Sequence, residues 1–254
     1  MSSPFAQTIN SETPKTNKAM STGKSNKEKQ ILKIVTWNIQ GLNKEGKLKE
    51  SVQELHKYDI DILAVQEINA KGTAITSFKK YIWCIGGGVR NKLGTGFIIK
   101  EKLKNKIVDY RIINERLSVI RIKGKCRKLT ILNVHAFTEE TGEDTKQTFY
   151  DTIEESPNNV ASFDMKIIII GDFNAKIGKE ERNYEIAGKE SLRRKSNKNG
   201  QRLIDLAPGN RMIIKTIHLK HKDIHKQTWI SPDKKTLNQI YHLLIEKKNM
   251  QNVS

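Results

Sequence analysis

The apolar residues of this chain occur in short, dense runs separated by polar turns. No aliphatic run exceeds the four residues from Ile167 to Ile170, far fewer than the roughly 20 apolar residues that a membrane helix needs. Short runs rich in Ile, Val and Leu are typical of buried β-strands. Because 36% of the 254 residues are hydrophobic, the chain has enough apolar material for one large core. We predict a soluble, intracellular protein with no membrane partner.

The order of the expected elements indicates the fold class. Strand patterns at 31–37 and 60–65 flank an amphipathic helix with Leu48, Val52 and Leu55 on one face. Strand patterns then follow one another with few helices between them, which favours hairpins and antiparallel pairing. The later strands are expected at 97–100, 107–113, 117–122, 129–134, 166–170, 212–216 and 237–245, with helices at 143–155 and near 203–206. We predict an α/β fold of two mixed sheets packed face to face, with helices outside.

Composition divides the chain into two parts and suggests a partner. Residues 1–28 contain almost no large apolar side chain, so we expect a flexible basic tail before a folded domain at 29–254. Lys and Arg total 46 against 28 Asp and Glu, a net charge of +18 that favours a polyanion, nucleic acid first. A Lys-rich composition also suits solubility alone. The two cysteines, Cys84 and Cys126, are too few for a disulfide framework, and we expect buried, reduced thiols.

Polar side chains stand where the predicted strands stop. Asn38 ends the first strand, Glu67 the second, His135 the run 129–134, and Asp172 with Asn174 the run 167–170. Singly, each has a structural explanation, such as a turn, an Asx-turn or the first turn of a helix, and a lone His is more often structural than functional. Together, oxygen-rich groups without a thiolate cluster suit a hard cation such as Mg²⁺.

A basic stretch lies between residues 193 and 202, with five basic residues and no acid. We interpret it as a loop able to follow a DNA backbone, or equally as a solvated loop. An aromatic side chain near the site, Trp229, is able to stack on a base, although an aromatic in a strand is more often core. The candidate nucleic-acid contacts are Arg193, Arg194, Lys195, Lys198, Arg202 and Trp229.

The strand-end motifs resemble the endonuclease/exonuclease/phosphatase superfamily. Within it they are most similar to the apurinic-type endonuclease domain of non-LTR retrotransposons and to the related craniofacial development protein 2-like group. The resemblance spans about residues 30–250, with further similar stretches at 115–120, 199–203 and 227–233. The motifs are Thr36-Trp37-Asn38, Gln66-Glu67, the strand end at His135, and Gly171-Asp172-Phe173-Asn174-Ala175.

The resemblance implies a four-layered sandwich and a metal-dependent phosphodiester hydrolase acting on DNA, with the nucleus as a candidate compartment. Asn38 and Glu67 correspond to the metal site, with Glu67 as the direct ligand of Mg²⁺, or of Mn²⁺ as the alternative. His135 stands where relatives place a His or Tyr against the scissile phosphate. Asp172 corresponds to the acid that orients or deprotonates the attacking water, and Asn174 to the amide that supports the phosphorane.

The chain also departs from the family pattern. Tyr241 stands where the family has an Asp, Phe137 where relatives have a Pro, and the family's final strand with its Ser-Asp-His triplet is not reached. We expect a looser turn after His135 and very weak or absent cleavage, because removing one member of a catalytic unit takes most of the rate. The alternatives are a non-catalytic nucleic-acid-binding remnant and, less favoured by the charge, an inositol-phosphate phosphatase or sphingomyelinase.

Overall fold

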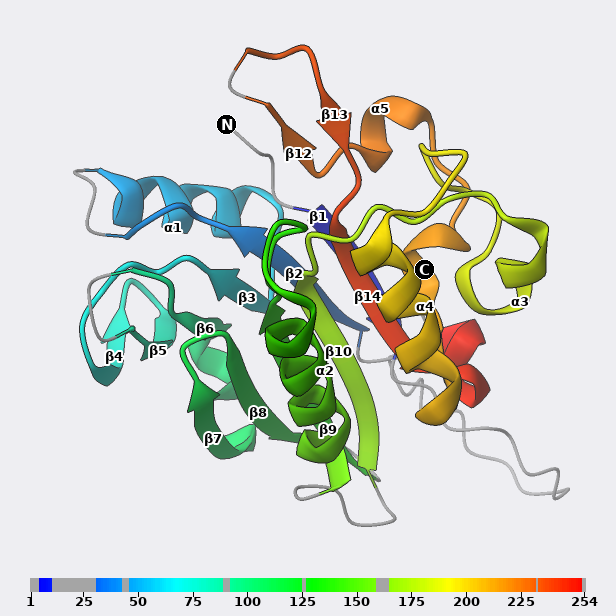
Figure 1. Cartoon of the computed structure of the whole chain (residues 1–254). Coiled ribbons are helices and arrows are strands. Elements are labelled where there is room, and N and C mark those ends of the chain that lie inside the picture. Colours follow the sequence, from blue (N-terminus) through cyan, green and yellow to red (C-terminus); the bar gives the residue numbers. More distant parts are fainter. Residues whose placement is uncertain are drawn as a thin grey trace, which may run out of the picture.

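Two six-stranded β-sheets pack against each other through their inner faces (Figure 1). The computed structural model describes residues 5–10, 31–42, 46–88, 92–124, 127–158, 165–231 and 233–252. The strand order is β1-β2-β3-β6-β5-β4 in the first sheet and β11-β14-β10-β9-β8-β7 in the second. Both sheets are mixed, because β2 is parallel to β3 and β9 is parallel to β10 while the remaining pairs are antiparallel.

The strands of both sheets match most of the predicted ones within a few residues. The first sheet comprises β1 (Phe5–Asn10), β2 (Ile31–Asn38), β3 (Ile62–Gln66), β4 (Thr73–Phe78), β5 (Tyr81–Gly86) and β6 (Thr95–Lys100). The second comprises β7 (Ile107–Asn114), β8 (Leu117–Lys123), β9 (Lys128–His135), β10 (Met165–Asp172), β11 (Met212–Ile214) and β14 (Tyr241–Glu246). A separate hairpin pairs β12 (Trp229–Ile230) with β13 (Leu237–Asn238).

Helices cover the outer faces of the sandwich. The α-helices are α1 (Lys47–Lys57), α2 (Glu143–Asn158), α3 (Tyr184–Ala187), α4 (Lys198–Gly209) and α5 (Asp223–Lys226), and 3₁₀ turns occupy Glu101–Lys106, Glu181–Asn183, Lys215–Ile217 and Lys247–Asn252. Val52 and Leu55 of α1 pack on the outer face of the first sheet. Phe149 and Ile153 of α2 pack with Leu203 of α4 on the outer face of the second. The layers are therefore helix, sheet, sheet and helix, as predicted.

Side chains alternate between the inner and outer faces of each strand, as the two-residue period of a β-strand requires. Ile34 of β2 and Ile168 of β10 point into the core between the sheets, whereas Val35 and Ile169 point outward under the helices. The inner core consists mostly of Ile and Leu side chains, together with Phe97 and Cys84, and it turns polar where β2, β3 and β9 end and β6 and β8 begin. Polar inner-face residues therefore gather at one end of the sandwich.

Three features of the fold differ from the sequence predictions. Within the expected tail 1–28, Phe5–Asn10 forms strand β1 and pairs with the open edge of β2; the rest of that range lies outside the described residues. The expected strand 237–245 is divided between β13 and β14, because its first residues pair with β12 instead of the main sheet. Strands β4 and β5 form a hairpin at the edge of the first sheet that we did not predict.

The structure also bears on the expected buried thiols and on the expected absence of a membrane helix. Cys84 is buried and free, and burial raises the pKa of its thiol to about 11; Cys126 lies outside the described residues. None of the helices in the described part of the chain combines the length and apolarity that crossing a bilayer requires.

Candidate active site

Four strands that bear predicted site residues end at the same edge of the sandwich. β2 and β3 run parallel, with Asn38 opposite Gln66, and β9 and β10 run parallel, with His135 opposite Asp172. Parallel neighbours present their carboxyl ends at one edge of a sheet, so the residues that follow them lie close together. The fold therefore brings together groups that are widely separated in sequence.

The Asn38 amide joins the two predicted acids. Its Nδ2 donates to Glu67 Oε1 at 2.7 Å and to Asp172 Oδ2 at 3.2 Å, and its Oδ1 accepts from the backbone N–H of Gln40 at 3.2 Å. One neutral side chain of the first sheet thus holds carboxylates from both sheets. The side chain of Glu67 is 33% exposed, whereas Asp172 is only 3% exposed. Ligands have access to Glu67 more readily than to Asp172.

Asp172 is held in a buried position that favours its protonated form. Burial raises the pKa of Asp172 to about 7, with a further contribution from the negative charge of Glu67. Hydrogen bonds from the Asn174 N–H, at 3.0 Å, and from the Asn38 amide oppose this increase. The preceding Gly171 lets β10 approach β9, because a Cβ at Gly171 would lie 1.9 Å from the carbonyl oxygen of Val134.

Backbone strain is concentrated around these acids. Gln40, Glu67 and Asn174 all have left-handed conformations, with φ of +53°, +52° and +48°. Such a conformation costs a non-glycine residue about 1 to 2 kcal/mol. The Gly41 N–H donates to the Glu67 carbonyl at 2.7 Å and helps to fix this turn. Strained residues of this kind are common at functional sites.

His135 completes the cluster as a neutral imidazole. It is 5% exposed, and its Nε2 lies 3.5 Å from Glu67 Oε1. Burial lowers the pKa of His135 to about 3, and the nearby charge of Arg116 lowers it further. The ring is therefore uncharged at neutral pH, and its Nδ1 is buried without a hydrogen-bond partner among the described residues.

Sequence reasoning did not single out Arg116, the cation nearest to this cluster. Its guanidinium donates from Nη1 to the His135 carbonyl at 3.2 Å and stacks 4.1 Å from the ring centroid of Phe137. Burial lowers the pKa of Arg116, while the charges of Glu115, Glu67 and Asp172 oppose that decrease. The similar stretch at 115–120 was the available signal. The Phe137 ring also packs against Phe149, with the two ring centroids 5.4 Å apart, and the looser turn expected after His135 stays a prediction.

Two amides connect the loops that follow β9 and β10. Asn174 Nδ2 donates to the Ala136 carbonyl at 3.0 Å. The buried side chain of Asn199 donates to the carbonyls of Phe137, at 2.9 Å, and Asn174, at 3.2 Å. The Asn174 amide therefore has a structural partner, and its predicted contact with a phosphorane stays a prediction.

Tyr241 lies beside the buried acid. It is opposite Asp172 in the antiparallel register of β14 and β10 and is 1% exposed. The next residue, His242, faces the other way: its ring bonds Thr216 Oγ1 at 3.2 Å and the Ala175 carbonyl at 2.9 Å, and burial lowers its pKa to about 4. His242 supports the loop after Asp172 and does not belong to the cluster.

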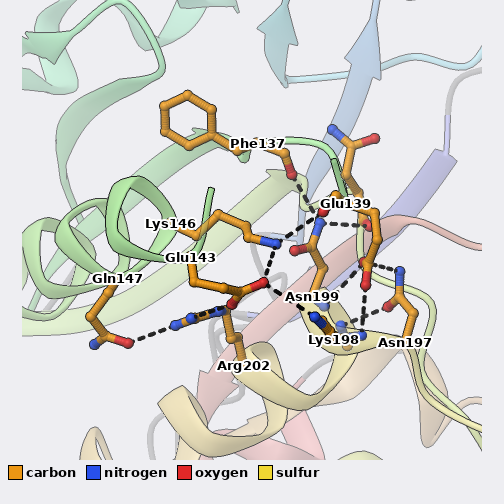
Figure 2. A network of polar contacts seen from close by, with 11 residues as sticks. Phe137, Glu139, Glu143, Lys146, Gln147, Asn197, Lys198, Asn199 and Arg202 are labelled. Carbon is orange, nitrogen blue, oxygen red and sulfur yellow. Dashed lines mark hydrogen bonds and ion pairs between the residues drawn. The ribbon is translucent and has the colours of Figure 1, made fainter. Parts of the chain in front are cut away.

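Part of the basic stretch is helical and already paired. The expected loop ends at Asn197, whose Oδ1 accepts from the Gly200 N–H at 2.8 Å and caps α4. Arg202 donates to Glu143 at 2.7 Å and to Gln147 at 2.6 Å, and Lys198 Nζ lies 3.8 Å from Glu143 (Figure 2). Arg202 thus links α4 to α2.

The remaining candidate DNA contacts differ in availability. Arg193 Nη2 donates to the Leu237 carbonyl at 3.1 Å and to Asn238 Oδ1 at 2.5 Å. Arg194 and Lys195 are exposed, and Trp229 is partly exposed in β12. Contact with nucleic acid stays a prediction for all six residues; Arg194, Lys195 and Lys198 are the exposed cations among them.

The donor set fits a hard cation that uses few protein ligands. Within the described ranges, no group of three or more His, Cys, Asp and Glu side chains is arranged to hold a metal. Mg²⁺ takes one or two carboxylates and completes its shell with water and phosphate oxygens. Glu67 matches that requirement, because its side chain is one-third exposed and lies near a second carboxyl group, that of Asp172. The negative charge of Glu67 helps to raise the pKa of Asp172.

Comparisons with known proteins identify relatives of the chain and of its fold. The chain is 30% identical over 216 residues to craniofacial development protein 2 from Bos taurus, covering 85% of this chain and 36% of that protein. It therefore spans about a third of that relative's length. Two solved structures share the fold. One is the endonuclease domain of TRAS1, a telomere-specific non-LTR retrotransposon, with 13% identity, a TM-score of 0.58 and coverage of 85% of this chain and 84% of that chain.

The other is the 3′ phosphatase NExo from Neisseria bound to a product DNA hairpin, with 16% identity, a TM-score of 0.60 and coverage of 87% and 88% of the two chains. The family described as the Endonuclease/Exonuclease/phosphatase family matches residues 35–187, more than half of the chain. The chain belongs to the endonuclease/exonuclease/phosphatase family.

Proposed function

We propose that the chain is a divalent-metal-dependent phosphodiesterase of the DNA endonuclease type, with impaired activity. The observation that supports this most directly is the bridge from the Asn38 amide to Glu67 and Asp172. It presents two carboxylates at one edge of the sandwich, next to a neutral imidazole. Such a site suits hydrolysis of a phosphate ester, in which charge develops on oxygen atoms.

Glu67 is the residue that would hold the cation, Mg²⁺ or Mn²⁺. When bound, the cation neutralises charge on the phosphate and on the leaving oxygen. Asn38 keeps the Glu67 carboxylate in place through the 2.7 Å hydrogen bond to Oε1, and His135 Nε2 lies 3.5 Å from the same oxygen. Both neighbours are uncharged, so neither competes with a cation for the carboxylate.

Asp172 is suited to accept a proton from water. A general base works best when its pKa is close to the working pH, and the pKa of Asp172 is about 7. The Asn174 N–H and the Asn38 amide orient its two oxygens. In this proposal Asp172 aims and deprotonates the nucleophile, while Asn174 keeps the loop closed on Ala136.

The impairment is assigned to Tyr241. A phenol stays protonated at neutral pH and offers no negative charge where relatives place an acid. The ring is buried beside Asp172, so solvent does not replace the missing carboxylate. Because members of a catalytic unit are not additive, this one change lowers the rate by orders of magnitude.

DNA is the substrate that the charge and the relatives support. The net charge of +18 favours a polyanion, and NExo is seen with a DNA product. We therefore propose DNA as the partner and the nucleus as the compartment in which the chain acts.

A plasmid-nicking assay tests this proposal. We expect slow, Mg²⁺-dependent nicking by the wild-type chain that is lost in Glu67→Gln and in Asp172→Ala. Asp61→Asn, at the other end of β3, serves as the control that leaves nicking unchanged. Equal nicking by wild type and Glu67→Gln would refute the proposal. Salt-dependent DNA binding without any metal-dependent nicking would instead support the non-catalytic binding alternative.

A further inference from the structure

Five fully buried polar side chains form a layer between the sheets, next to the candidate site. Each has an exposed fraction of 0%, in a core that otherwise consists of apolar side chains, mostly Ile and Leu. They come from five different strands, three of the first sheet and two of the second. We call this set the polar layer: Thr36, Gln66, Thr95, Ser118 and Asn133.

Within the polar layer, Gln66 and Asn133 connect the two sheets. Gln66 Nε2 donates to Asn133 Oδ1 at 2.5 Å and to Thr36 Oγ1 at 2.9 Å. Asn133 Nδ2 donates to two backbone carbonyls of the first sheet, Val65 at 2.8 Å and Gly96 at 2.7 Å. We call the Gln66–Asn133 pair the inter-sheet clamp. Its hydrogen bonds join β9 directly to β3 and β6.

The clamp adjoins the residues that meet in the site. Gln66 immediately precedes Glu67, and Asn133 lies two residues before His135 on the same face of β9. Two residues of a strand span about 6.6 Å, so the clamp is one repeat away from the 3.5 Å contact between His135 and Glu67. Ile131, two residues before Asn133 on the same face of β9, packs in the apolar core without any polar link. Packing alone therefore does not require a hydrogen-bonded pair at Asn133.

We propose that the inter-sheet clamp is a positioning device that sets the offset of the two sheets at which Glu67 and His135 meet. Aliphatic side chains pack without strong directional preference, so they tolerate small displacements of one sheet past the other. Hydrogen bonds require defined distances and angles, so the paired amide donors of Gln66 and Asn133 favour one arrangement of the two sheets. Gln66 Oε1, Thr95 Oγ1 and Ser118 Oγ have no hydrogen-bond partner among the described residues, so the clamp depends on these donors alone. The proposal concerns the geometry of the site. It relies on the proposed function only for its metal-binding readout.

Histidine NMR tests the clamp without activity or metal. Glu67→Gln alters the neighbour of His135, so we expect it to shift the ring resonances of His135 in the otherwise wild-type chain. In an Asn133→Leu background we expect that shift to fall at least threefold. Ile131→Ala, a buried change on the same strand and face, is the matched control for lost stability, and there the shift should persist. Gln66→Met is the milder variant if Asn133→Leu does not fold.

Two further measurements separate positioning from simple destabilisation. The double variant Gln66→Leu/Asn133→Leu leaves no unpaired side-chain amide, so its Tm should recover relative to Asn133→Leu while the His135 response stays lost. Mn²⁺ affinity should fall at least tenfold in Asn133→Leu and less than twofold in Ile131→Ala. An equal His135 response in wild-type and Asn133→Leu backgrounds would overturn the clamp. Absence of Mn²⁺ binding by the wild type would refute the proposed function. The NMR comparison, which needs no metal, would then decide on the clamp by itself.

Discussion

A carboxylate flanks each end of strand β3, and the two carboxylates have different partners. At the start of the strand, Asp61 Oδ1 lies 2.7 Å from Lys102 Nζ and 3.2 Å from Lys100 Nζ, and Asp61 Oδ2 accepts from the Lys33 N–H at 3.1 Å. At the other end, Glu67 contacts the uncharged side chains of Asn38 and His135. Both acids sit at the rim of the same sheet, so the difference lies in their partners.

This difference shows which end is ready for a ligand. The negative charge of Asp61 is balanced by two lysines, and its side chain is only 5% exposed, so this end is complete as it stands. The negative charge of Glu67 instead helps, by repulsion, to raise the pKa of Asp172, and the nearby charge of Arg116 acts on both acids. A cation would relieve that repulsion. The same strand thus has a structural acid at one end and an acid suited to metal binding at the other.

The largest expected effect is loss of the catalytic base. Asp172→Asn retains the shape of the side chain but removes its ability to accept a proton, so we expect nicking to fall by about a hundredfold or more. Metal-dependent nicking is measured on supercoiled plasmid, with Asp61→Asn as the matched acid-to-amide change at the other end. A similar loss in both variants would remove the distinction between the two ends.

The pH dependence of stability is the next effect. The pKa of Asp172 is about 7 in the fold against the ordinary 3.8, so the folded state binds more protons between these values. The stability contribution of Asp172 therefore falls as pH rises from about 4 to about 7, by up to about 4 kcal/mol. His135 and His242, with pKa values lowered to about 3 and about 4, act in the opposite direction below pH 6.5.

The variant Asp172→Asn isolates this contribution, because both histidines remain. We expect urea-derived free energies of unfolding for the variant and the wild type to agree more closely at pH 4 than at pH 8, where the variant is the more stable. A constant difference from pH 4 to pH 8 would contradict the raised pKa of Asp172.

A moderate effect is expected at the lysine-balanced end. Asp61→Asn leaves Lys100 and Lys102 without their shared carboxylate, and we expect a loss of about 1 to 3 kcal/mol of stability. The free energy of unfolding measures this loss, and Mn²⁺ affinity should stay within twofold of the wild type. A large loss of Mn²⁺ affinity would show that the two ends are coupled.

The smallest effect concerns DNA contacts. Replacing the exposed pair Arg194 and Lys195 with Ser should lower the slope of log binding constant against log salt by about 2. Arg202→Gln should leave the slope nearly unchanged, because its guanidinium is paired with Glu143. Fluorescence anisotropy with a labelled duplex at several salt concentrations measures both. The reverse ranking would mean that the α2–α4 pairing opens to bind DNA.

Strand-end chemistry was predictable because local patterns determine it. The apolar runs before Asn38, His135 and Asp172 defined strands, and a strand end fixes where the next polar side chain can lie. The layered fold followed from the order of these strands. The β4–β5 hairpin was missed because β4 is an exposed edge strand of mostly polar and small residues, which lacks the apolar period that marks a buried strand.

Long-range pairing was not predictable from local patterns. Nothing adjacent to Arg116 in sequence indicates that its guanidinium stacks on Phe137 beside His135. The basic residue Arg202 gave the same local signal as Arg194, yet only tertiary structure places Glu143 of α2 next to it. The clamp between Gln66 and Asn133 likewise depends on the packing of two sheets. Such contacts can be identified only once the three-dimensional fold is known.

The most direct test of the account compares the two ends of β3 as cation sites. Mn²⁺ binding at neutral pH is measured by calorimetry for the wild type, Glu67→Gln and Asp61→Asn. We predict one site in the wild type, retained in Asp61→Asn and weakened at least tenfold in Glu67→Gln. Equal Mn²⁺ affinity in the wild type and Glu67→Gln would contradict the assignment of the Asn38–Glu67–Asp172 cluster as a metal-dependent site.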